Sequence, residues 1–509
     1  MFERGAKGRT GASLPAPEVP QVDPAALYGD LFRKQQPGLA EVSEPEAVRH
    51  YVQLSQQNFA IDTGMYPLGS CTMKYNPKVN EWAARLPGFA TLHPLTPDSM
   101  AQGALELMYR LEQGLAQVCG MDRVSLQPAA GAQGEYVGLQ MIRAYHTAQG
   151  RSPKKVLIPE TAHGTNPASC ALNGFTAVPF PMDEHGIVLP EQLPLLVDDD
   201  VAAIMVTNPN TVGLFETHMA TIAEMVHAKG GLVYGDGANL NAIMGRGRPG
   251  DFGIDVMQFN LHKTFTTPHG GGGPGCGPVG YKKILDPSRP CPCRSATRTA
   301  PTAWTTAAAR RASVACARST PTSAWLRART RTCARWGPRA CAWPRISRCS
   351  TPTTCACLGE TWKVAFDRTC MHEVVISDKH PKDTHVTTMD VAKRPDGLRL
   401  PPPTVYFPLV VKGAMLIEPT GDRDQAGARR LRGGHAGHQR RGPPRARDVT
   451  GAPHLTRLRR LTRRVRLARR CCATPRLLAL EAIPAAQAVG RPGDRERETP
   501  GGGGRRASS

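Results

Sequence analysis

The chain has 509 residues, 40% of them hydrophobic and 21% charged, with a formal net charge of +22. This length allows two or three domains with a sizeable core. No apolar run approaches the ~18 residues of a membrane span, and the N-terminal stretch lacks the apolar region of a signal peptide, which together exclude a membrane partner and predict a soluble, cytoplasmic protein.

The positive charge is concentrated in two segments of unusual composition. Residues 291–357 contain 12 Arg and no Lys, Asp or Glu, and residues 421–509 contain 22 Arg, no Lys and 7 acidic residues. These segments carry +12 and +15, so the remaining residues carry −5. The overall charge would suggest a nucleic-acid partner, but the rest of the chain is mildly acidic, and we expect none.

The first basic segment has no hydrophobic periodicity and holds 8 of the 15 Cys and 4 of the 6 Trp, and the second has one isolated apolar stretch, at 477–489. This composition is typical of a GC-rich coding sequence translated out of frame. We interpret both segments as frameshifted and expect from them an irregular chain with no site, because they offer little apolar surface to offset the entropy of ordering. The alternative is a natural disordered region that binds RNA. Their cysteines lack zinc-site spacing, so no metal site is predicted.

The N-terminal residues 1–60 predict an extended Pro-rich arm followed by a helix over 43–58. Ser43 and Glu46 have the spacing of a capping box at the start of that helix. Residues 64–80 are rich in turn formers and predict a loop.

Beyond this loop, helices and strands alternate as far as residue 260. The apolar, β-branched strands predict a mainly parallel sheet with helices on both faces, and ligands of such sheets bind at the carboxyl ends of the strands. Helices are predicted at 98–120, 131–150, 166–174 and 219–230, and strands at 123–128, 154–160, 176–182, 201–209, 231–237 and 255–260.

Candidate functional residues follow the ends of these strands. Each has an ordinary alternative, such as a helix cap, a loop residue or a surface lysine beside a glycine linker. Together they fit pyridoxal phosphate, which needs an anion-binding turn, a flat group against its ring, a carboxylate at the ring nitrogen and a lysine for its aldehyde. The candidates are Gly131, Ala132 and Gln133 for the phosphate, His163 for the ring, Asn208 and Asn210 in the next loop, Asp236 for the ring nitrogen, and Lys263.

Several long stretches carry a resemblance to a known family. The stretches are "MYPLGSCTMKYNPK", "QPAAGAQGEY", "AHGTNPAS", "TNPNTVGLFE", "YGDGANLNA" and "NLHKTFTTPHGGGGPGCGPVG". They closely resemble glycine dehydrogenase (decarboxylating), the P-protein family of the glycine cleavage system, in particular the second subunit of its two-subunit bacterial form. The resemblance extends to about residue 290 and resumes over 358–420, with a departure at 395–401.

The resemblance implies a fold-type I α/β enzyme that depends on pyridoxal 5'-phosphate. The large domain would span 61–290, and 358–420 would be the remnant of a damaged smaller C-terminal α/β domain. Lys263 would hold the cofactor's aldehyde, Asp236 would pair with its ring nitrogen, and His163 would stack on its ring.

The implied reaction is decarboxylation of glycine with transfer of the aminomethyl group to the lipoyl group of H-protein. Lys263, once released, would carry a proton. P-protein subunit 1 would be a further partner, in a heterotetramer with two copies of each subunit. The loop at 64–76 would form a wall of the glycine or lipoyl pocket, or else pack between domains.

Three other functions remain open from the sequence. The first is that of another group of fold-type I enzymes, such as an amino-acid decarboxylase or desulfurase. The second is nucleic-acid binding through the basic tail, which would depend steeply on salt. The third is an inactive product of the frameshifts.

Overall fold

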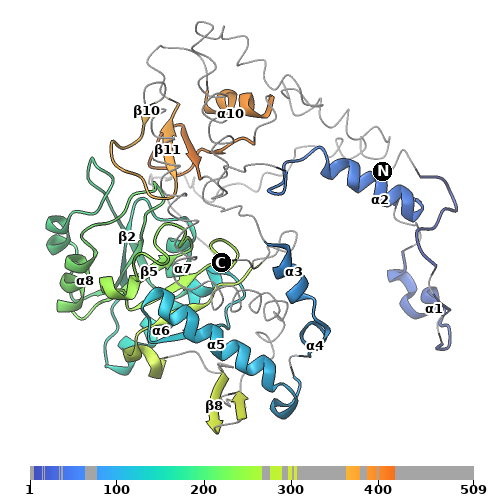
Figure 1. Cartoon of the computed structure of the whole chain (residues 1–509), viewed down its shortest axis with the longest axis horizontal. Coiled ribbons are helices and arrows are strands. Elements are labelled where there is room, and N and C mark those ends of the chain that lie inside the picture. Colours follow the sequence, from blue (N-terminus) through green and yellow to red (C-terminus); the bar gives the residue numbers. More distant parts are fainter. Residues whose placement is uncertain are drawn as a thin grey trace, which may run out of the picture. The chain divides into compact units, whose positions relative to one another are not determined.

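A computed structural model describes most of the chain outside the two basic segments (Figure 1). The described residues are 5–63, 77–265, 267, 275–288, 363–378, 387–397 and 401–418, without 14, 17, 34, 36, 37 and 94, together with the backbone of 296–300 and 303–306. The loop at 64–76 and most of the glycine run after Lys263 lie outside these residues.

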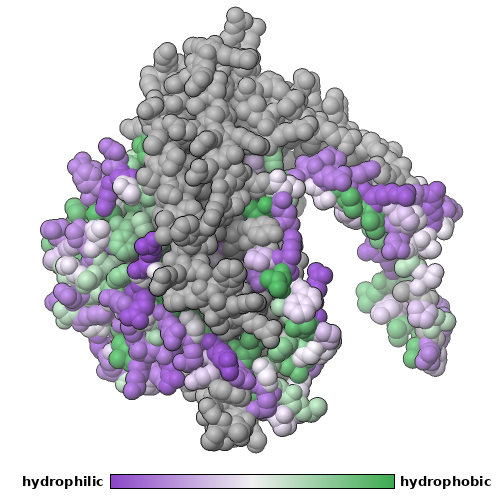
Figure 2. All heavy atoms as spheres, viewed as in Figure 1, coloured by the Kyte–Doolittle hydropathy of each residue, from purple (hydrophilic) through white to green (hydrophobic). Residues whose placement is uncertain are grey.

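The N-terminal arm contains the helix predicted from its capping box. Helix α2 begins after Ser43, whose backbone N–H donates to the Glu46 carboxylate at 2.9 Å. Many large apolar side chains of the arm are exposed (Figure 2), among them Leu27, Leu31 and Tyr51. The arm's elements are α1 (Pro24–Tyr28), η1 (Gly29–Leu31) and α2 (Glu44–Ser55).

A seven-stranded sheet forms the centre of the next part of the chain, in the order β1-β7-β6-β5-β4-β2-β3. The pairs formed by β2 to β6 are parallel, as predicted, whereas β7 pairs antiparallel with β1 and β6. The predicted strand at 123–128 pairs over only three residues. The strands are β1 (Arg123–Ser125), β2 (Lys155–Pro159), β3 (Thr176–Phe180), β4 (Val201–Thr207), β5 (Leu232–Gly237), β6 (Val256–Phe259) and β7 (Val279–Tyr281).

Helices precede or connect these strands. The long amphipathic helix predicted from residue 98 begins after a 3-10 turn and ends at Gly120, which has the left-handed φ of 72° common at helix ends. The elements are α3 (Lys78–Ala84), α4 (Pro87–Ala90), η2 (Asp98–Met100), α5 (Gln102–Cys119), α6 (Gly131–Ala148), α7 (Thr165–Leu172), η3 (Pro190–Leu195), α8 (Met219–Ala228), η4 (Pro249–Phe252) and η5 (Lys283–Ser288).

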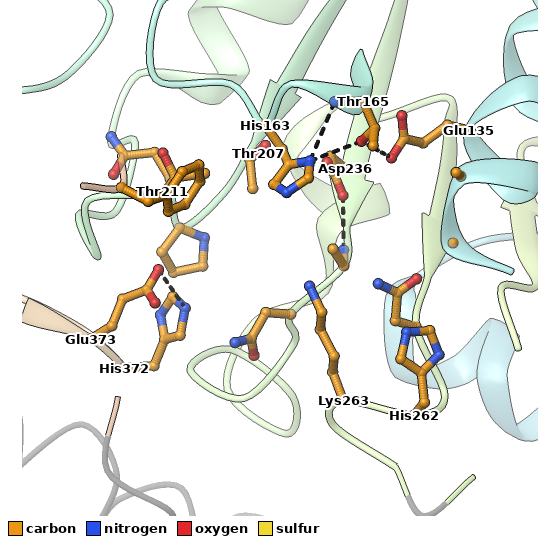
Figure 3. A pocket seen from close by; sticks show the side chains of 18 of the residues that line it. Glu135, His163, Thr165, Thr207, Thr211, Asp236, His262, Lys263, His372 and Glu373 are labelled. Carbon is orange, nitrogen blue, oxygen red and sulfur yellow. Dashed lines mark hydrogen bonds and ion pairs between the residues drawn. The ribbon is translucent and has the colours of Figure 1, made fainter. Parts of the chain in front are cut away.

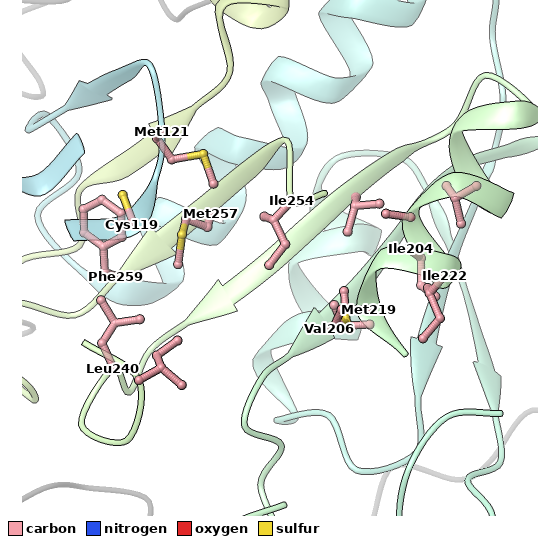
Figure 4. Close-up of a cluster of buried hydrophobic side chains, with 14 of the residues drawn as sticks. Cys119, Met121, Ile204, Val206, Met219, Ile222, Leu240, Ile254, Met257 and Phe259 are labelled. Atoms are coloured by element: carbon pink, nitrogen blue, oxygen red, sulfur yellow. The ribbon is translucent and has the colours of Figure 1, made fainter. Parts of the chain in front are cut away.

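Both faces of the sheet are buried, as the unbroken apolar strands predict. Along β4, Ile204 and Val206 face the core that α5 and α8 cover (Figure 4), and Ala203 and Met205 face the core that α6 and α7 cover. Successive side chains of a strand point to opposite faces, so a strand with helices on both sides needs apolar residues throughout.

The described residues between 363 and 418 include a separate antiparallel sheet in the order β10-β11-β13-β12. Its buried residues include Ile376 and Met415. The stretch 404–411 has strand character and pairs with β13 at Thr404 and Val405, and the N–H of Tyr406 donates to the carbonyl of Ala414 at 2.8 Å. The residues after Tyr406 form turns. The elements are β10 (Lys363–Val364), β11 (Val374–Ser377), α10 (Thr388–Gly397), β12 (Thr404–Val405) and β13 (Ala414–Ile417).

A short hairpin occurs within the first basic segment. Strands β8 (Ala296–Ala300) and β9 (Ala303–Thr306) pair antiparallel. The prediction that 291–357 is irregular is therefore wrong for these two strands, because backbone pairing needs no hydrophobic pattern. The rest of this segment and all of 421–509 lie outside the described residues.

None of the helices in the described part of the chain combines the length and apolar character needed to cross a bilayer.

One ion pair makes the stability of the sheet depend on pH. His227 Nε2 lies 2.7 Å from Asp255 Oδ2, and this hydrogen bond raises the pKa of His227. The folded state therefore favours the protonated ring, and its stabilisation is complete below the unfolded-state pKa of about 6.5 and is lost as the pH rises through the folded-state pKa. We expect His227→Gln to lower the free energy of unfolding more at pH 5.5 than at pH 9 in urea titrations. An equal loss at both values would contradict a contribution from this charge.

Candidate active site

A cavity of about 450 Å³ lies at the carboxyl ends of β4, β5 and β6, where the parallel sheet predicts a ligand site (Figure 3). The N-terminus of α6 and side chains from the 363–418 part also line it. The lining residues are Ala130, Gly131, Ala132, Glu135, His163, Thr165, Thr207, Pro209, Asn210, Thr211, Asp236, Ala238, Asn239, Asn260, His262, Lys263, His372, Glu373 and Phe407.

Asp236 lies near the end of β5 and is 4% exposed. Its carboxylate accepts hydrogen bonds from Asn166 Nδ2 at 3.0 Å, from the backbone N–H of Ala238 at 2.9 Å and from Gln258 Nε2. Gln258 in turn accepts from the hydroxyl of Tyr234 at 2.6 Å. Three donors thus hold an acceptor-only carboxylate at the cavity wall.

Lys263 follows β6 in a turn in which its backbone N–H donates to the carbonyl of Asn260 at 3.2 Å. Its half-buried side chain extends into the cavity toward the strand end that carries Asp236 (Figure 3). Among the described residues that line the cavity, Lys263 is the only lysine. Lys282, another lysine nearby in sequence, instead donates to the carbonyl of Gly120 at 2.8 Å.

His163 lies between β2 and α7, with its ring at the cavity wall. Nδ1 lies 3.0 Å from the hydroxyl of Thr165 and accepts from the backbone N–H of Thr165 at 3.3 Å. Burial lowers the pKa of His163; Asp236 opposes this effect and Lys263 adds to it. The ring of Phe407, from the turn after β12, lies 5.7 Å from the His163 ring between centroids.

The N-terminus of α6 presents the backbone of Gly131 and Ala132 to the cavity. A Cβ on Gly131 would lie 2.3 Å from Asn260 Oδ1, so a larger residue here would have to displace the Asn260 amide from its place at the cavity wall. Free N–H groups and the positive end of the helix dipole at this position favour a phosphate.

Comparisons with known proteins agree with this geometry. The chain is 47% identical over 424 residues to glycine dehydrogenase (decarboxylating) subunit 2 of Listeria innocua, covering 82% of this chain and 86% of the relative. It is 48% identical over 425 residues to the Desulforamulus reducens protein of the same name, covering 82% and 87%. The chain belongs to the family of glycine dehydrogenase (decarboxylating) subunit 2. No family model matches the chain.

Solved structures confirm the fold class predicted for this chain. A crystal structure of glycine decarboxylase (P-protein) of the glycine cleavage system in inhibitor-bound form matches with a TM-score of 0.63 and 19% identity, over 81% of this chain and 92% of that chain. Glutamate decarboxylase of Lactobacillus brevis matches with a TM-score of 0.61 and 14% identity, over 86% and 98%. The fold is the predicted fold-type I α/β architecture.

One predicted cofactor ligand, Asn208, does not line the cavity. Its amide pairs at both ends with the backbone of Glu216, at 3.0 and 3.2 Å. The order of residues does not reveal this competing backbone group. The phosphate prediction for Gln133 concerns its backbone N–H at the start of α6 and stays a prediction, whereas its side chain accepts from the N–H of Ala129 at 2.7 Å and shapes the turn before α6.

Other cavity residues were missed by sequence reasoning. Thr207 is the last residue of β4 and Asn260 follows β6, so the strand-end rule was sufficient to find both. Glu135 lies one helical turn after Gly131 in α6, and this spacing from the glycine turn could have indicated that it lies near the cavity. His372, Glu373 and Phe407 come from the 363–418 part and carry no local signal.

Close packing at Gly277 supports the α6 N-terminus. A Cβ on Gly277 would lie 2.1 Å from the carbonyl oxygen of Ala130. We expect Gly277→Ala to lower the free energy of unfolding by roughly 1–3 kcal/mol, since backbone atoms must move to admit the methyl group. Gly114→Ala, in an open position on α5, should instead be neutral or stabilising by up to about 1 kcal/mol. Equal effects in denaturant titrations would contradict this packing.

Proposed function

We propose that this chain decarboxylates glycine with the help of pyridoxal 5'-phosphate and passes the aminomethyl group to the lipoyl group of H-protein. The observation that carries the proposal is the placement of Lys263 and the buried Asp236 at the ends of adjacent strands of one cavity. The names of the relatives supply the substrate, since they are glycine dehydrogenases (decarboxylating).

The residues of the cavity fit this cofactor. Its volume of about 450 Å³ lies within the range of small-molecule sites, roughly 300–1,000 Å³. Among the described residues, the hydroxyl of Thr207 and Oδ1 of Asn260 are buried without a hydrogen-bond partner. Because buried polar atoms normally have a partner, these two atoms are available to bind a polar ligand in the cavity.

Each part of the cofactor would have a matching group in the chain. Lys263 would be its covalent attachment point, Asp236 would lie at the ring nitrogen, and His163 would lie against the ring. The N–H groups of Gly131 and Ala132 would hold the phosphate. Bound in this way, pyridoxal phosphate supplies an electron sink for the electrons of a broken bond.

The chain's own groups would orient the reaction and control its protons. Asp236, held by three donors, keeps a proton at the ring nitrogen by its negative charge. Lys263 Nζ, once released from covalent attachment, accepts and returns a proton beside the substrate. Phe407 and the His372–Glu373 pair, whose Nε2 and Oε1 lie 3.3 Å apart, would cover the cavity and exclude water.

The proposed macromolecular partners follow from the family. The designation subunit 2 in the relatives implies a subunit 1, and we propose that the two chains assemble with two copies of each. Lipoylated H-protein would be the acceptor.

A direct test is isotope exchange between labelled CO₂ and the carboxyl group of glycine. We expect exchange that requires glycine, pyridoxal phosphate, lipoylated H-protein and subunit 1 together. Glutamate and cysteine in place of glycine are the controls, because enzymes of the same fold decarboxylate or desulfurate such amino acids. Exchange or release with one of these, and none with glycine, would overturn the proposal in favour of another fold-type I enzyme.

A further inference from the structure

A chain of hydrogen bonds joins His163 to the buried carboxylate of Glu135 at another part of the cavity wall. His163 Nδ1 lies 3.0 Å from Thr165 Oγ1, and Thr165 Oγ1 lies 2.7 Å from Glu135 Oε1 (Figure 3). The other oxygen of Glu135 accepts from the hydroxyl of Ser169 at 3.0 Å. Glu135 is 4% exposed, and its hydrogen bond with Thr165 joins it to His163.

The hydroxyl of Thr165 has a single proton, which couples its two neighbours. If Glu135 is protonated, its O–H donates to Thr165 Oγ1, and the Thr165 hydroxyl donates to His163 Nδ1. If Glu135 is ionised, the Thr165 hydroxyl donates to Glu135, and Nδ1–H of His163 donates to Thr165 Oγ1. Both arrangements use the same Nδ1–Oγ1 and Oγ1–Oε1 distances, and the second also gives up the 3.3 Å hydrogen bond that the backbone N–H of Thr165 donates to Nδ1.

We propose that Glu135, acting through Thr165, holds a proton in reserve for His163. In the transfer, the Oε1–H bond of Glu135 breaks as its proton passes to Thr165 Oγ1, and the hydroxyl proton of Thr165 passes to Nδ1. The His163 ring, which already has a proton on Nε2, becomes a cation, and Glu135 becomes an anion. Glu135 is thus a positioning residue that acts through two others.

The surroundings of Glu135 suit a group that keeps its proton near neutral pH. Burial and the negative charge of Asp236 raise the pKa of Glu135 to about 7, while the bonds from Thr165, Ser169 and Asn166 oppose that rise. The other titratable groups facing Glu135 are Tyr234 and Cys170, both of which are neutral at this pH because burial raises their pKa. The charged groups facing His163 are Asp236, which favours its cation, and Lys263, which opposes it.

The proposed reaction has a use for this proton, and in this respect the inference rests on the proposed function. When the aminomethyl group bonds to one sulfur of the lipoyl disulfide, the S–S bond breaks and the other sulfur leaves as a thiolate. That thiolate takes up one proton to become a thiol. His163 Nε2, on the side of the ring away from Thr165, gives its proton to the cavity, and the ring remains neutral with a proton on Nδ1.

The test measures the titration of His163 in the chain without cofactor or substrate. Diethyl pyrocarbonate modifies neutral imidazole, so the modification rate of the His163 peptide against pH, followed by mass spectrometry, reports its midpoint. We expect Glu135→Gln to lower that midpoint by about one pH unit, because glutamine has no proton to give and cannot form the ion pair with His163 that the transfer through Thr165 creates. Glu112→Gln, a buried glutamate on α5 that does not line the cavity, is the matched control and should leave the midpoint unchanged.

Variants of Thr165 distinguish a proton relay from a direct electrostatic effect of Glu135 on His163. Thr165→Val should lower the His163 midpoint as much as Glu135→Gln does, whereas Thr165→Ser should leave it unchanged. The double variant Glu135→Gln with Thr165→Val should have the same midpoint as either single variant. An unchanged midpoint in Glu135→Gln overturns the proposal, as does an equal additional shift when Glu135→Gln is made in the Thr165→Val background. If Glu135→Gln does not fold, the comparison of Thr165→Val with Thr165→Ser decides.

A second readout applies to the assembled enzyme. Glu135→Gln should slow glycine-dependent CO₂ exchange about tenfold, less than loss of a direct acid catalyst, with KM for glycine changed less than about twofold. If the natural chain shows no glycine-dependent CO₂ exchange, the proposed function is refuted. The His163 titration still tests the relay in that case. A chain with normal exchange and an unshifted midpoint in Glu135→Gln refutes only the relay.

Discussion

Replacing Lys263 by alanine is expected to remove covalent cofactor attachment and to lower glycine-dependent CO₂ exchange by on the order of 10³-fold or more. The side chain is the only lysine among the described residues of the cavity wall. Its loss removes both the attachment point and the amine that returns a proton. Weak binding should remain, because the α6 N-terminus and Asp236 still hold the phosphate and ring nitrogen.

The measurement is reduction of the loaded protein with borohydride, followed by peptide mapping. In the natural chain the cofactor should be fixed to the peptide containing Lys263, with loss of visible absorption. Lys282→Ala is the control, since Lys282 donates to the carbonyl of Gly120 and does not line the cavity. A label on Lys74 or Lys282 in the natural chain would contradict the assignment.

The second large effect is expected for Asp236→Asn, which should lower kcat by roughly 10²–10⁴-fold and weaken glycine binding far less. The amide keeps the shape of the carboxylate but has no charge to keep a proton on the ring nitrogen. Because Asn166, Gln258 and Ala238 all donate to this position, the new NH₂ group also faces a donor. We therefore expect an additional loss of about 1–3 kcal/mol in the free energy of unfolding.

Asp255→Asn is the control that separates a loss of kcat from a loss of stability. Asp255 is also buried, at 7% exposure, and accepts from the N–H of Val233 at 2.8 Å, but it does not line the cavity. Its replacement should reduce stability and leave kcat within about threefold of the natural value. Unchanged turnover in Asp236→Asn would show that Asp236 only caps the turn after β5.

The two basic segments bear on whether the encoded chain is active. The relatives match 82% of the chain, which leaves out about as many residues as the segment 421–509 contains. We propose that this segment and the non-hairpin part of 291–357 contribute no group to the reaction. Resequencing the gene around the codons for residues 290, 357 and 420 checks the frameshift interpretation; an unchanged reading frame would contradict it.

The sequence alone was sufficient to predict the mainly parallel sheet and the position of its site. Apolar runs such as 201–206 are long enough to show that both faces of the strand are covered, and each strand's last residues can be read directly from the chain. Asp236, His163 and Lys263 were selected in this way, and all three line one cavity because the carboxyl ends of parallel strands meet at one edge. The capping box at Ser43 was predictable because it involves neighbours three residues apart.

Only the tertiary structure decided which side chains face the cavity and how they are linked. Asn208 follows β4 at the predicted edge, but the backbone of Glu216 binds its amide and the residue does not line the cavity. Phe407 reaches the wall from more than 140 residues beyond Lys263, since the turn after β12 leaves its sheet. The contact of Glu135 with Thr165 joins residues 30 positions apart. Such contacts depend on how separate elements pack, and no local pattern of residues encodes them.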